Sequence, residues 1–277
     1  MPVILKITWL QWPRIAAIEW IKVPAARMGC AVQSKNIPLH EVMKTHQRSN
    51  TMNDLNLPKR HPGNTNLTIW YEPTYRGLLL MVEKSPFFKE YLEDLWRTTQ
   101  WALGCYSRVF AARVDLTFPD GYDMPDDFVH NVAMSRFVES FEGHIQADQD
   151  RSRREGKRVH STDLHYFWVR EVGGNGRPHY HFAFLLNKDA YHTLGRFETE
   201  RVNLFHRLQW AWASALRLDV SEIKGQVNVP DNPEFFLTRA FGDPGVAAFF
   251  HRVSYFCKTA TKDFPGRTRG RGSSQRR

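Results

Sequence analysis

The sequence is poor in cysteine and has no uninterrupted apolar segment long enough to cross a membrane. Its three cysteines, Cys30, Cys105 and Cys257, lie far apart and form no CxxC pair. This spacing argues against a disulfide framework or a structural zinc site and suits a reducing compartment. Charges such as Lys6 and Arg14 interrupt the apolar N-terminal stretch, which resembles neither a membrane span nor a secretory signal. We therefore expect a cytoplasmic protein with no membrane contact.

The sequence also lacks the motifs of nucleotide-dependent enzymes. It contains no P-loop, and the glycines of segment 173–176 do not fit the Rossmann fingerprint. No internal repeat and no helix-turn-helix pair stand out. We therefore expect a chemistry that needs no nucleotide cofactor.

What the chain has in excess is positive charge. Lysine and arginine number 38 against 29 aspartates and glutamates, giving a formal net charge of +9. A basic chain attracts polyanions, of which nucleic acid is the commonest. Charge alone leaves open both a nucleic-acid-binding protein and a soluble basic protein without such a partner.

Three regions differ in composition. Residues 1–65 show no clear pattern and are interpreted as an N-terminal extension. Residues 66–262 carry the periodicities of a folded domain, and 42% hydrophobic residues suffice for a sizeable core. Residues 263–277 are rich in Gly, Ser and Arg and are too polar to fold alone, so they predict a basic flexible tail.

The folded region alternates between strand-like and helix-like patterns. Ser85 followed by Pro86 predicts a helix N-terminus, and Val114, Leu116 and Phe118 share the apolar face of a strand. The other expected elements are strands at 164–172, 179–186 and 226–229, and helices at 125–150, 189–194, 199–216 and 244–261. Because helices or longer loops separate the strands, we predict an α+β fold with a central, mostly antiparallel β-sheet flanked by helices.

Two histidines two residues apart form the first possible site. In a strand, His179 and His181 point to the same side, while Tyr180 and Phe182 point to the opposite layer. If the preceding strand forms a hairpin with this one, Glu171 lies beside the histidines. Two imidazoles and one carboxylate leave positions open for water and a phosphate oxygen, as in a catalytic metal site. The alternative is a pair of ordinary histidines beside a solvated acid at a strand end.

A tyrosine forms the second possible site. Helical spacing puts the apolar residues of 246–260 on one stripe and Tyr255 on the other face, near His251, Lys258 and Lys262. A phenol is a poor nucleophile unless cations or a metal favour the phenolate, and Lys258 is one turn away. Asp115, on the polar face of a strand, supports the metal or pairs with an arginine. The alternative is a surface tyrosine beside a surface lysine.

Basic side chains cluster at residues 151–158, before the predicted strand at 164–172, and near the C-terminus. We expect phosphate contacts or, alternatively, solvated surface segments from Arg151, Arg153, Arg154, Lys157, Arg158 and Lys262.

Taken together, three sequence blocks resemble the motifs of HUH endonucleases, the rolling-circle replication initiators. RVDLTFP resembles the first motif, GRPHYHFAFLLNKDAYHTLG the histidine motif, and VSYFCKTATK the YxxK motif of single-tyrosine members. Within that class, residues 65–275 resemble the filamentous-phage (inovirus) gene II initiators and their prophage YagK- and YfjJ-type relatives. The long N-terminal extension has no counterpart in the resemblance.

The resemblance implies a role for each residue. His179, His181 and Glu171 would bind Mg²⁺ or Mn²⁺, although Glu171 matches by position only. Tyr255 would attack single-stranded or supercoiled origin DNA, leaving a 5′-phosphotyrosine and a 3′-OH. Lys258 would assist at the phosphate.

The resemblance also implies a setting, the cytoplasm of a bacterial host cell, with a host helicase and polymerase as partners. Tyr166 and Tyr191 are available as second tyrosines but carry no motif. Two rival functions remain open, a non-catalytic prophage DNA-binding protein and a metal-dependent nuclease that uses water.

Overall fold

The central sheet of the protein is antiparallel throughout. The computed structural model describes residues 57–123, 130–174, 176–196, 202–262, 264 and 269–274. The sheet order is β10 (Glu234–Thr238), β6 (Arg108–Leu116), β8 (Pro178–Asn187), β7 (His165–Val172) and β11 (Arg271–Ser273), with β9 (Val227–Asn228) also on β6. Every pairing in it is antiparallel. The predicted α+β class is confirmed.

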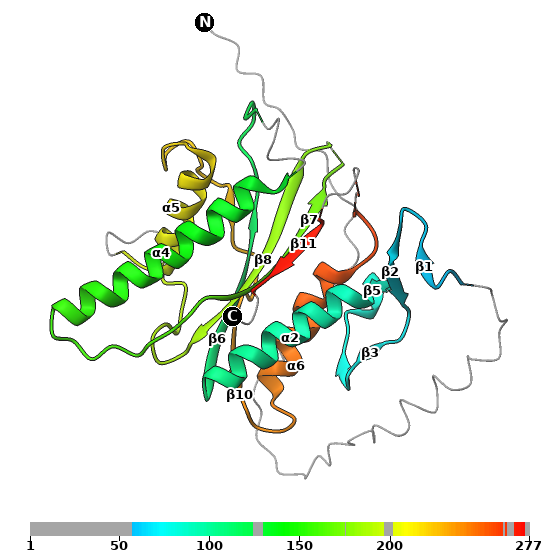
Figure 1. Cartoon of the computed structure of the whole chain (residues 1–277), viewed down its shortest axis with the longest axis horizontal. Coiled ribbons are helices and arrows are strands. Elements are labelled where there is room, and N and C mark those ends of the chain that lie inside the picture. Colours follow the sequence, from blue (N-terminus) through cyan, green and yellow to red (C-terminus); the bar gives the residue numbers. More distant parts are fainter. Residues whose placement is uncertain are drawn as a thin grey trace, which may run out of the picture. The chain divides into compact units, whose positions relative to one another are not determined.

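Helices cover both faces of this sheet (Figure 1). The helices α4 (Val132–Arg154) and α5 (Leu204–Leu216) pack on one face, and α2 (Lys89–Cys105) and α6 (Pro244–Ser254) pack on the other. Along β8, Tyr180 and Phe182 enter the α4/α5 core, while Ala183 and Leu185 enter the α2/α6 core. The prediction of a single apolar face for β6 is wrong, because Val109 and Ala111 are buried under α2 and α6.

A smaller sheet precedes α2. It consists of β1 (Arg60–His61), β2 (Asn64–Trp70) and β5 (Phe87–Phe88), and a hairpin of β3 (Thr74–Tyr75) and β4 (Leu78–Leu79) lies between β2 and the turn η1 (Val82–Lys84). Residues 60–65 therefore pair within the folded unit rather than in the predicted extension, whose residues 1–56 lie outside the described residues. The predicted helix start at Ser85 is also wrong. Strand β5 pairs with β2 and is fully buried, so α2 begins only at Lys89.

Other boundaries differ for local reasons. No helix forms at 189–194, because the Glu234 carboxylate binds the Leu194 amide and the Asn187 side chain binds the Asp189 amide. The final α-helix ends at Ser254 and not at 261, and it continues only as the 3-10 turn η2 (Tyr255–Cys257). The predicted helices at 125–150 and 199–216 correspond to α4 and α5; residues 125–129 and 199–201 lie outside the described residues.

The C-terminal segment joins the sheet. Strand β11 pairs with β7, and Arg271 forms an ion pair with Asp94 at 2.6 Å. The side chain of Asn131 donates a hydrogen bond to the carbonyl of Arg269 at 2.8 Å. The prediction of a flexible tail is therefore wrong for residues 269–274, because the edge of β7 supplies the backbone partners that a polar segment lacks alone.

This edge strand gives a first prediction. A Cβ atom on Gly272 would lie 2.6 Å from the indole of Trp168, which is buried directly opposite it. We expect Gly272→Val to lower the free energy of unfolding by about 1–3 kcal/mol in urea titrations, because the strand or the indole must move. The control is Gly143→Ala on α4, where a Cβ would meet nothing within 4 Å and a small gain is expected. Equal stabilities of the two variants would contradict the docking of β11.

Candidate metal and tyrosine site

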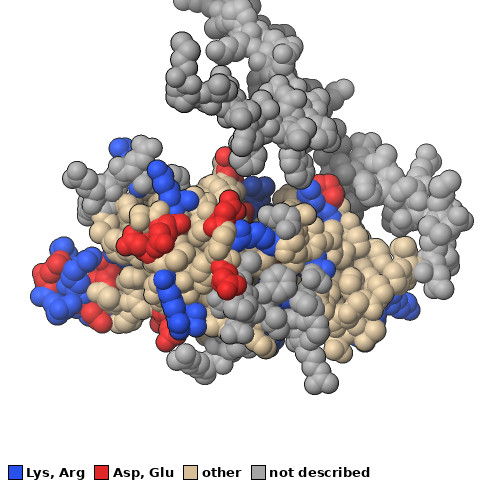
Figure 2. Space-filling model, turned by 90° about the horizontal axis from the view of Figure 1, so that it is seen from above, with Lys and Arg blue, Asp and Glu red and all other residues tan. Residues whose placement is uncertain are grey.

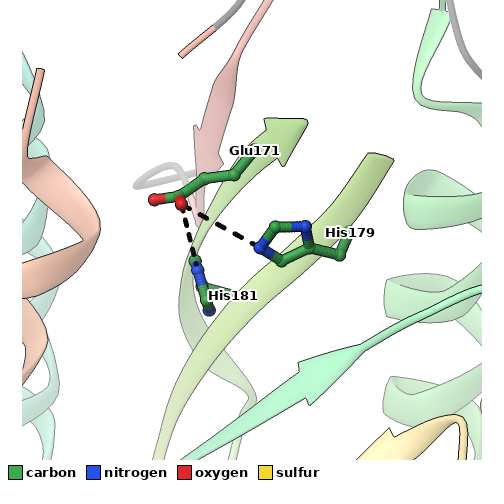
Figure 3. Close-up of side chains that lie close together, drawn as sticks. All are labelled: Glu171, His179 and His181. Carbon is green, nitrogen blue, oxygen red and sulfur yellow. Dashed lines mark ion pairs between the residues drawn. The ribbon is translucent and has the colours of Figure 1, made fainter. Parts of the chain in front are cut away.

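The two histidines and Glu171 meet at one end of the β7–β8 hairpin. In the strand register Glu171 lies opposite His179, and His181 is the next residue on the same face of β8 (Figure 3). This is the face covered by α2 and α6. The prediction that a hairpin brings the three residues together is confirmed, since side-chain alternation and a tight connection suffice for it.

Their ligand atoms converge. The Nε2 atom of His181 lies 3.5 Å from Oε2 of Glu171, and Nε2 of His179 lies 3.9 Å from the same oxygen. All three ligand atoms lie within 4.8 Å of one another. Glu171 and His181 are buried, whereas the His179 side chain is 26% exposed and marks the open side of the cluster. Burial lowers the pKa of His179 to about 4, so its imidazole is neutral at pH 7, as a metal ligand requires.

Asp115 holds His181 from behind. Its Oδ1 lies 2.7 Å from Nδ1 of His181, and Arg113 donates a hydrogen bond to the same oxygen at 3.1 Å. Burial acts to raise the pKa of Asp115, but the hydrogen bond with His181 and the charges of His181 and Arg113 lower it overall. Within the described part of the chain, Nε2 of His181 is buried and has no hydrogen-bond partner. A carboxylate behind a histidine whose other nitrogen is free is the usual support of a metal ligand.

Two lysines and a threonine hold Glu171. Lys258 Nζ donates to both carboxylate oxygens at 2.5 and 2.6 Å, Lys262 Nζ donates to Oε1, and Thr261 Oγ1 donates to Oε2 at 2.6 Å. Burial acts to raise the pKa of Glu171, but the His181 ring 3.5 Å away and the charges of Lys262 and Lys258 hold it well below its usual range. The carboxylate is therefore ionised.

The side chain of Lys262 lies inside the site, against Glu171, and not on the protein surface. Its side chain is only 1% exposed, and burial lowers its pKa to about 8. The structure places Lys262 as a partner of Glu171, and its contact with the DNA backbone stays a prediction. The helix that was expected to present it ends at Ser254, and the following chain turns Lys262 back onto Glu171.

Tyr255 lies against the histidines. Its ring centroid is 5.5 Å from that of His181, and Lys258 Nζ lies 3.7 Å from the ring centroid. The ring of Phe256 stacks on that of His181, with the centroids 5.0 Å apart. The Tyr255 side chain is partly buried, and its hydroxyl makes no hydrogen bond to any residue that the structure describes. The predicted nucleophile and the predicted metal ligands thus share one site.

The other two tyrosines lie elsewhere. Tyr166 packs against the α4/α5 core on the opposite face of the sheet. Tyr191 donates a hydrogen bond to Asp148 at 2.8 Å near the end of α4, and burial with this carboxylate raises its pKa. Tyr255 is therefore the single tyrosine at the site within the described chain.

The basic stretch at the end of α4 lies far from this site. The N-cap residue of α4, Asn131, accepts a hydrogen bond from Tyr180 beside the histidines, and the helix then runs about 30 Å away. The predicted DNA contacts here are exposed: Arg151, Arg153, Arg154, Lys157 and Arg158. Three of them form ion pairs with neighbouring acids: Arg151 with Asp148, Arg153 with Asp150 and Lys157 with Glu155. At this end of the molecule, on the left of Figure 2, basic and acidic groups accordingly alternate.

The comparisons with known proteins identify the family. Residues 71–274, well over half of the chain, match the family model of the YagK/YfjJ C-terminal domain. The chain belongs to the YagK/YfjJ family. It is 33% identical over 193 residues to the uncharacterised protein YagK of Escherichia coli strain K12, covering 67% of this chain and 92% of YagK. It is 31% identical over 159 residues to the uncharacterised protein YfjJ of the same organism, covering 54% of this chain and 76% of YfjJ. No solved structure matches the chain.

Every residue of the site lies inside the part that matches the YagK/YfjJ family. Two contributors were missed in the sequence, Arg113 and Thr261. Arg113 lies two residues before Asp115, so strand alternation alone puts it on the same face. Thr261 carried no such signal, because it follows the turn at which the last helix ends. As in other domains, residues beyond a helix end are the hardest to place from periodicity.

The support of His181 gives a second prediction for this YagK/YfjJ-family chain. Asp115→Asn removes the charge behind His181 but keeps the size of the side chain. We expect Mn²⁺ affinity, measured by calorimetry, to fall about 10- to 100-fold with the fold intact. Asp189→Asn, at an exposed acid paired with Arg108, is the control and should bind Mn²⁺ like the wild type. An unchanged affinity of the Asp115 variant would remove its orienting role.

Proposed function

We propose that this protein is a metal-dependent HUH-type endonuclease that initiates rolling-circle DNA replication. It would nick and rejoin a specific site in single-stranded DNA through a 5′-phosphotyrosine. One observation carries the proposal: the ring of Tyr255 lies 5.5 Å from that of His181, a member of a cluster of two histidines and one carboxylate. A nucleophile next to a metal site is the arrangement expected when the nucleophile attacks a phosphate that the metal polarises.

The residues present fit a divalent metal ion. His179, His181 and Glu171 offer two imidazoles and an ionised carboxylate, and the buried Nε2 of His181 has no hydrogen-bond partner among the described residues. Three protein ligands leave positions open, as in catalytic sites, and a nitrogen and oxygen donor set accepts Mn²⁺ or Mg²⁺. When bound, the ion would polarise a phosphate oxygen and offset its charge.

The chain's own residues would carry the covalent step. The Tyr255 hydroxyl oxygen attacks phosphorus and loses its proton to water, while the bond from phosphorus to the 3′ oxygen breaks. The 3′ oxygen takes up a proton and leaves as a 3′-OH that a polymerase can extend. Because the tyrosine ester keeps the energy of the phosphodiester, the reverse reaction closes the strand without a nucleotide cofactor.

Lys258 receives a different role from the one that the resemblance implies. It is 7% exposed and binds both oxygens of Glu171, so it positions a metal ligand and lies over the ring of the nucleophile. Lys262 and Thr261 also hold Glu171 in position. If the buried Lys258 ammonium moved to a DNA phosphate, Glu171 would lose two of the hydrogen bonds that hold it.

Several features support a replication initiator in particular. The HxH strand β8 is central in an antiparallel sheet, between the strands of Asp115 and Glu171. The three sequence blocks resemble, in the same order, the three motifs of rolling-circle initiators. The net charge of +9 suits a DNA substrate. A host polymerase and helicase in the bacterial cytoplasm would then act on the nicked origin.

The experiment uses single-stranded oligonucleotides from around the protein's own gene, labelled at the 3′ end, with Mn²⁺ or with EDTA. We expect Mn²⁺-dependent cleavage in which the labelled fragment migrates with the protein until protease is added. A labelled fragment with a free 5′-phosphate would support the water-using nuclease. Binding without cleavage across tiled oligonucleotides would support the non-catalytic DNA-binding protein.

A further inference from the structure

Three cationic side chains surround the ring of Tyr255. Measured to the ring centroid, Lys258 Nζ lies at 3.7 Å, Lys84 Nζ at 5.8 Å and the Arg113 guanidinium carbon at 5.9 Å. A phosphate in position for attack by Tyr255 would add negative charge at this point. The three cations are therefore candidate phosphate contacts near the nucleophile.

Two of the three are already engaged. Lys258 binds Glu171, and Arg113 binds Asp115 at 3.1 Å. Their side chains are only 7% and 6% exposed. Lys258 neutralises the buried Glu171, and Arg113 neutralises the partly buried Asp115. Moving either cation toward a DNA phosphate would cost an interaction that holds the proposed metal ligands.

Lys84 differs from both in exposure and in pairing. It is exposed at the end of η1 and forms no ion pair within the residues that the structure describes. An exposed ammonium on a flexible stem keeps its charge and can reach a phosphate.

The backbone that carries Lys84 is nevertheless fixed relative to Tyr255. On one side of Lys84, the amide of Met81 donates to Ser254 Oγ at 3.0 Å. On the other side, the Thr259 amide donates to the carbonyl of Pro86 at 2.9 Å, and Phe87 forms a β-bridge with Lys258. The segments 81–87 and 254–259 are thus joined on both sides of the nucleophile.

We infer that Lys84 binds the phosphate of single-stranded DNA on which Tyr255 acts, the role that the YxxK resemblance gives to Lys258. Of the three cations at the Tyr255 ring, Lys84 supplies a free positive charge, while Lys258 and Arg113 hold the carboxylates of the site. This inference rests on the proposed function for the reaction, but the phosphate contact itself can be measured without cleavage.

The experiment compares Lys84→Ala, Lys84→Arg and the control Lys89→Ala in the full chain. Lys89 is also an exposed lysine, but its Nζ lies 5.8 Å from the Trp70 ring. Binding of a fluorescent single-stranded oligonucleotide is titrated against salt with Ca²⁺ in place of Mn²⁺. Single-turnover cleavage is then followed with Mn²⁺, and Mn²⁺ affinity is measured for each variant.

We expect Lys84→Ala to lower the salt-dependence slope by about 0.7, the loss of one phosphate contact on a single strand. Cleavage should slow about 100-fold with Mn²⁺ affinity unchanged, as when one transition-state donor is removed. Lys84→Arg should recover most of the salt-dependence slope and most of the cleavage rate. Lys89→Ala should match the wild type in both measurements. If Lys84→Ala and Lys89→Ala behave alike in binding and in cleavage, the inference is overturned. If the wild type binds DNA but does not nick it, the proposed function fails and the salt slope alone decides the role of Lys84.

Discussion

Tyr255→Phe is expected to abolish strand cleavage, lowering its rate at least about a thousandfold, because it removes the only atom proposed to form the covalent bond. The substitution keeps the ring, so the contacts with His181 and Lys258 remain. Mn²⁺ affinity and unfolding free energy should therefore stay at the wild-type values. The rate is measured in single-turnover cleavage of the labelled oligonucleotide.

Tyr166→Phe is the matched control for this variant. Tyr166 lies on the opposite face of the sheet and packs against the α4/α5 core, so its hydroxyl is remote from the histidines. Cleavage by this control should remain near wild type. Cleavage that survives in Tyr255→Phe and yields a free 5′-phosphate would assign the attack to water and contradict a tyrosine nucleophile.

The second large effect is expected at the metal ligands. His179→Ala and His181→Ala should each weaken Mn²⁺ binding at least about 100-fold and abolish cleavage, because each removes one of three ligands. Since His181 is buried against Asp115 and Phe256, its loss should also lower stability. His179 is 26% exposed, so its variant separates metal loss from unfolding.

His144→Ala on α4 serves as the control, because that histidine contacts Trp210 on the other side of the sheet. Calorimetry gives the Mn²⁺ affinity, and oligonucleotide binding in EDTA tests whether DNA recognition survives. If both histidine variants bind Mn²⁺ like the wild type, the cluster is not a metal site. A variant that cleaves normally would remove the metal from the mechanism.

Strand patterns predicted the cluster of His179, His181 and Glu171 well. The two-residue period fixed His179 and His181 on one face, and the short glycine-containing connection brought Glu171 opposite them. Asp115 could be assigned only to one of two roles from the sequence. In the structure it contacts both His181 and Arg113.

Helical patterns predicted the surroundings of Tyr255 less well. They required a helix through residue 261, in which Lys258 would lie one turn above Tyr255. The α-helix instead ends at Ser254, and Lys258 turns toward Glu171 in extended backbone. The turn after Ser254 is fixed by contacts with Glu171, and β11 is fixed by pairing with β7. Both depend on residues far away in the sequence, so the local sequence pattern did not predict either. Lys84 was missed for the same reason, since it meets Tyr255 only through the contacts of segment 81–87.

The most direct test of the account is the mass of the covalent product. The wild-type protein is incubated with Mn²⁺ and an intact oligonucleotide that it cleaves. The adduct is then digested with trypsin and nuclease, and the modified peptide is sequenced by mass spectrometry. We predict one peptide that carries a 5′-linked nucleotide on Tyr255. A nucleotide on any other residue, or cleaved DNA with no modified peptide, would contradict the proposed tyrosine mechanism.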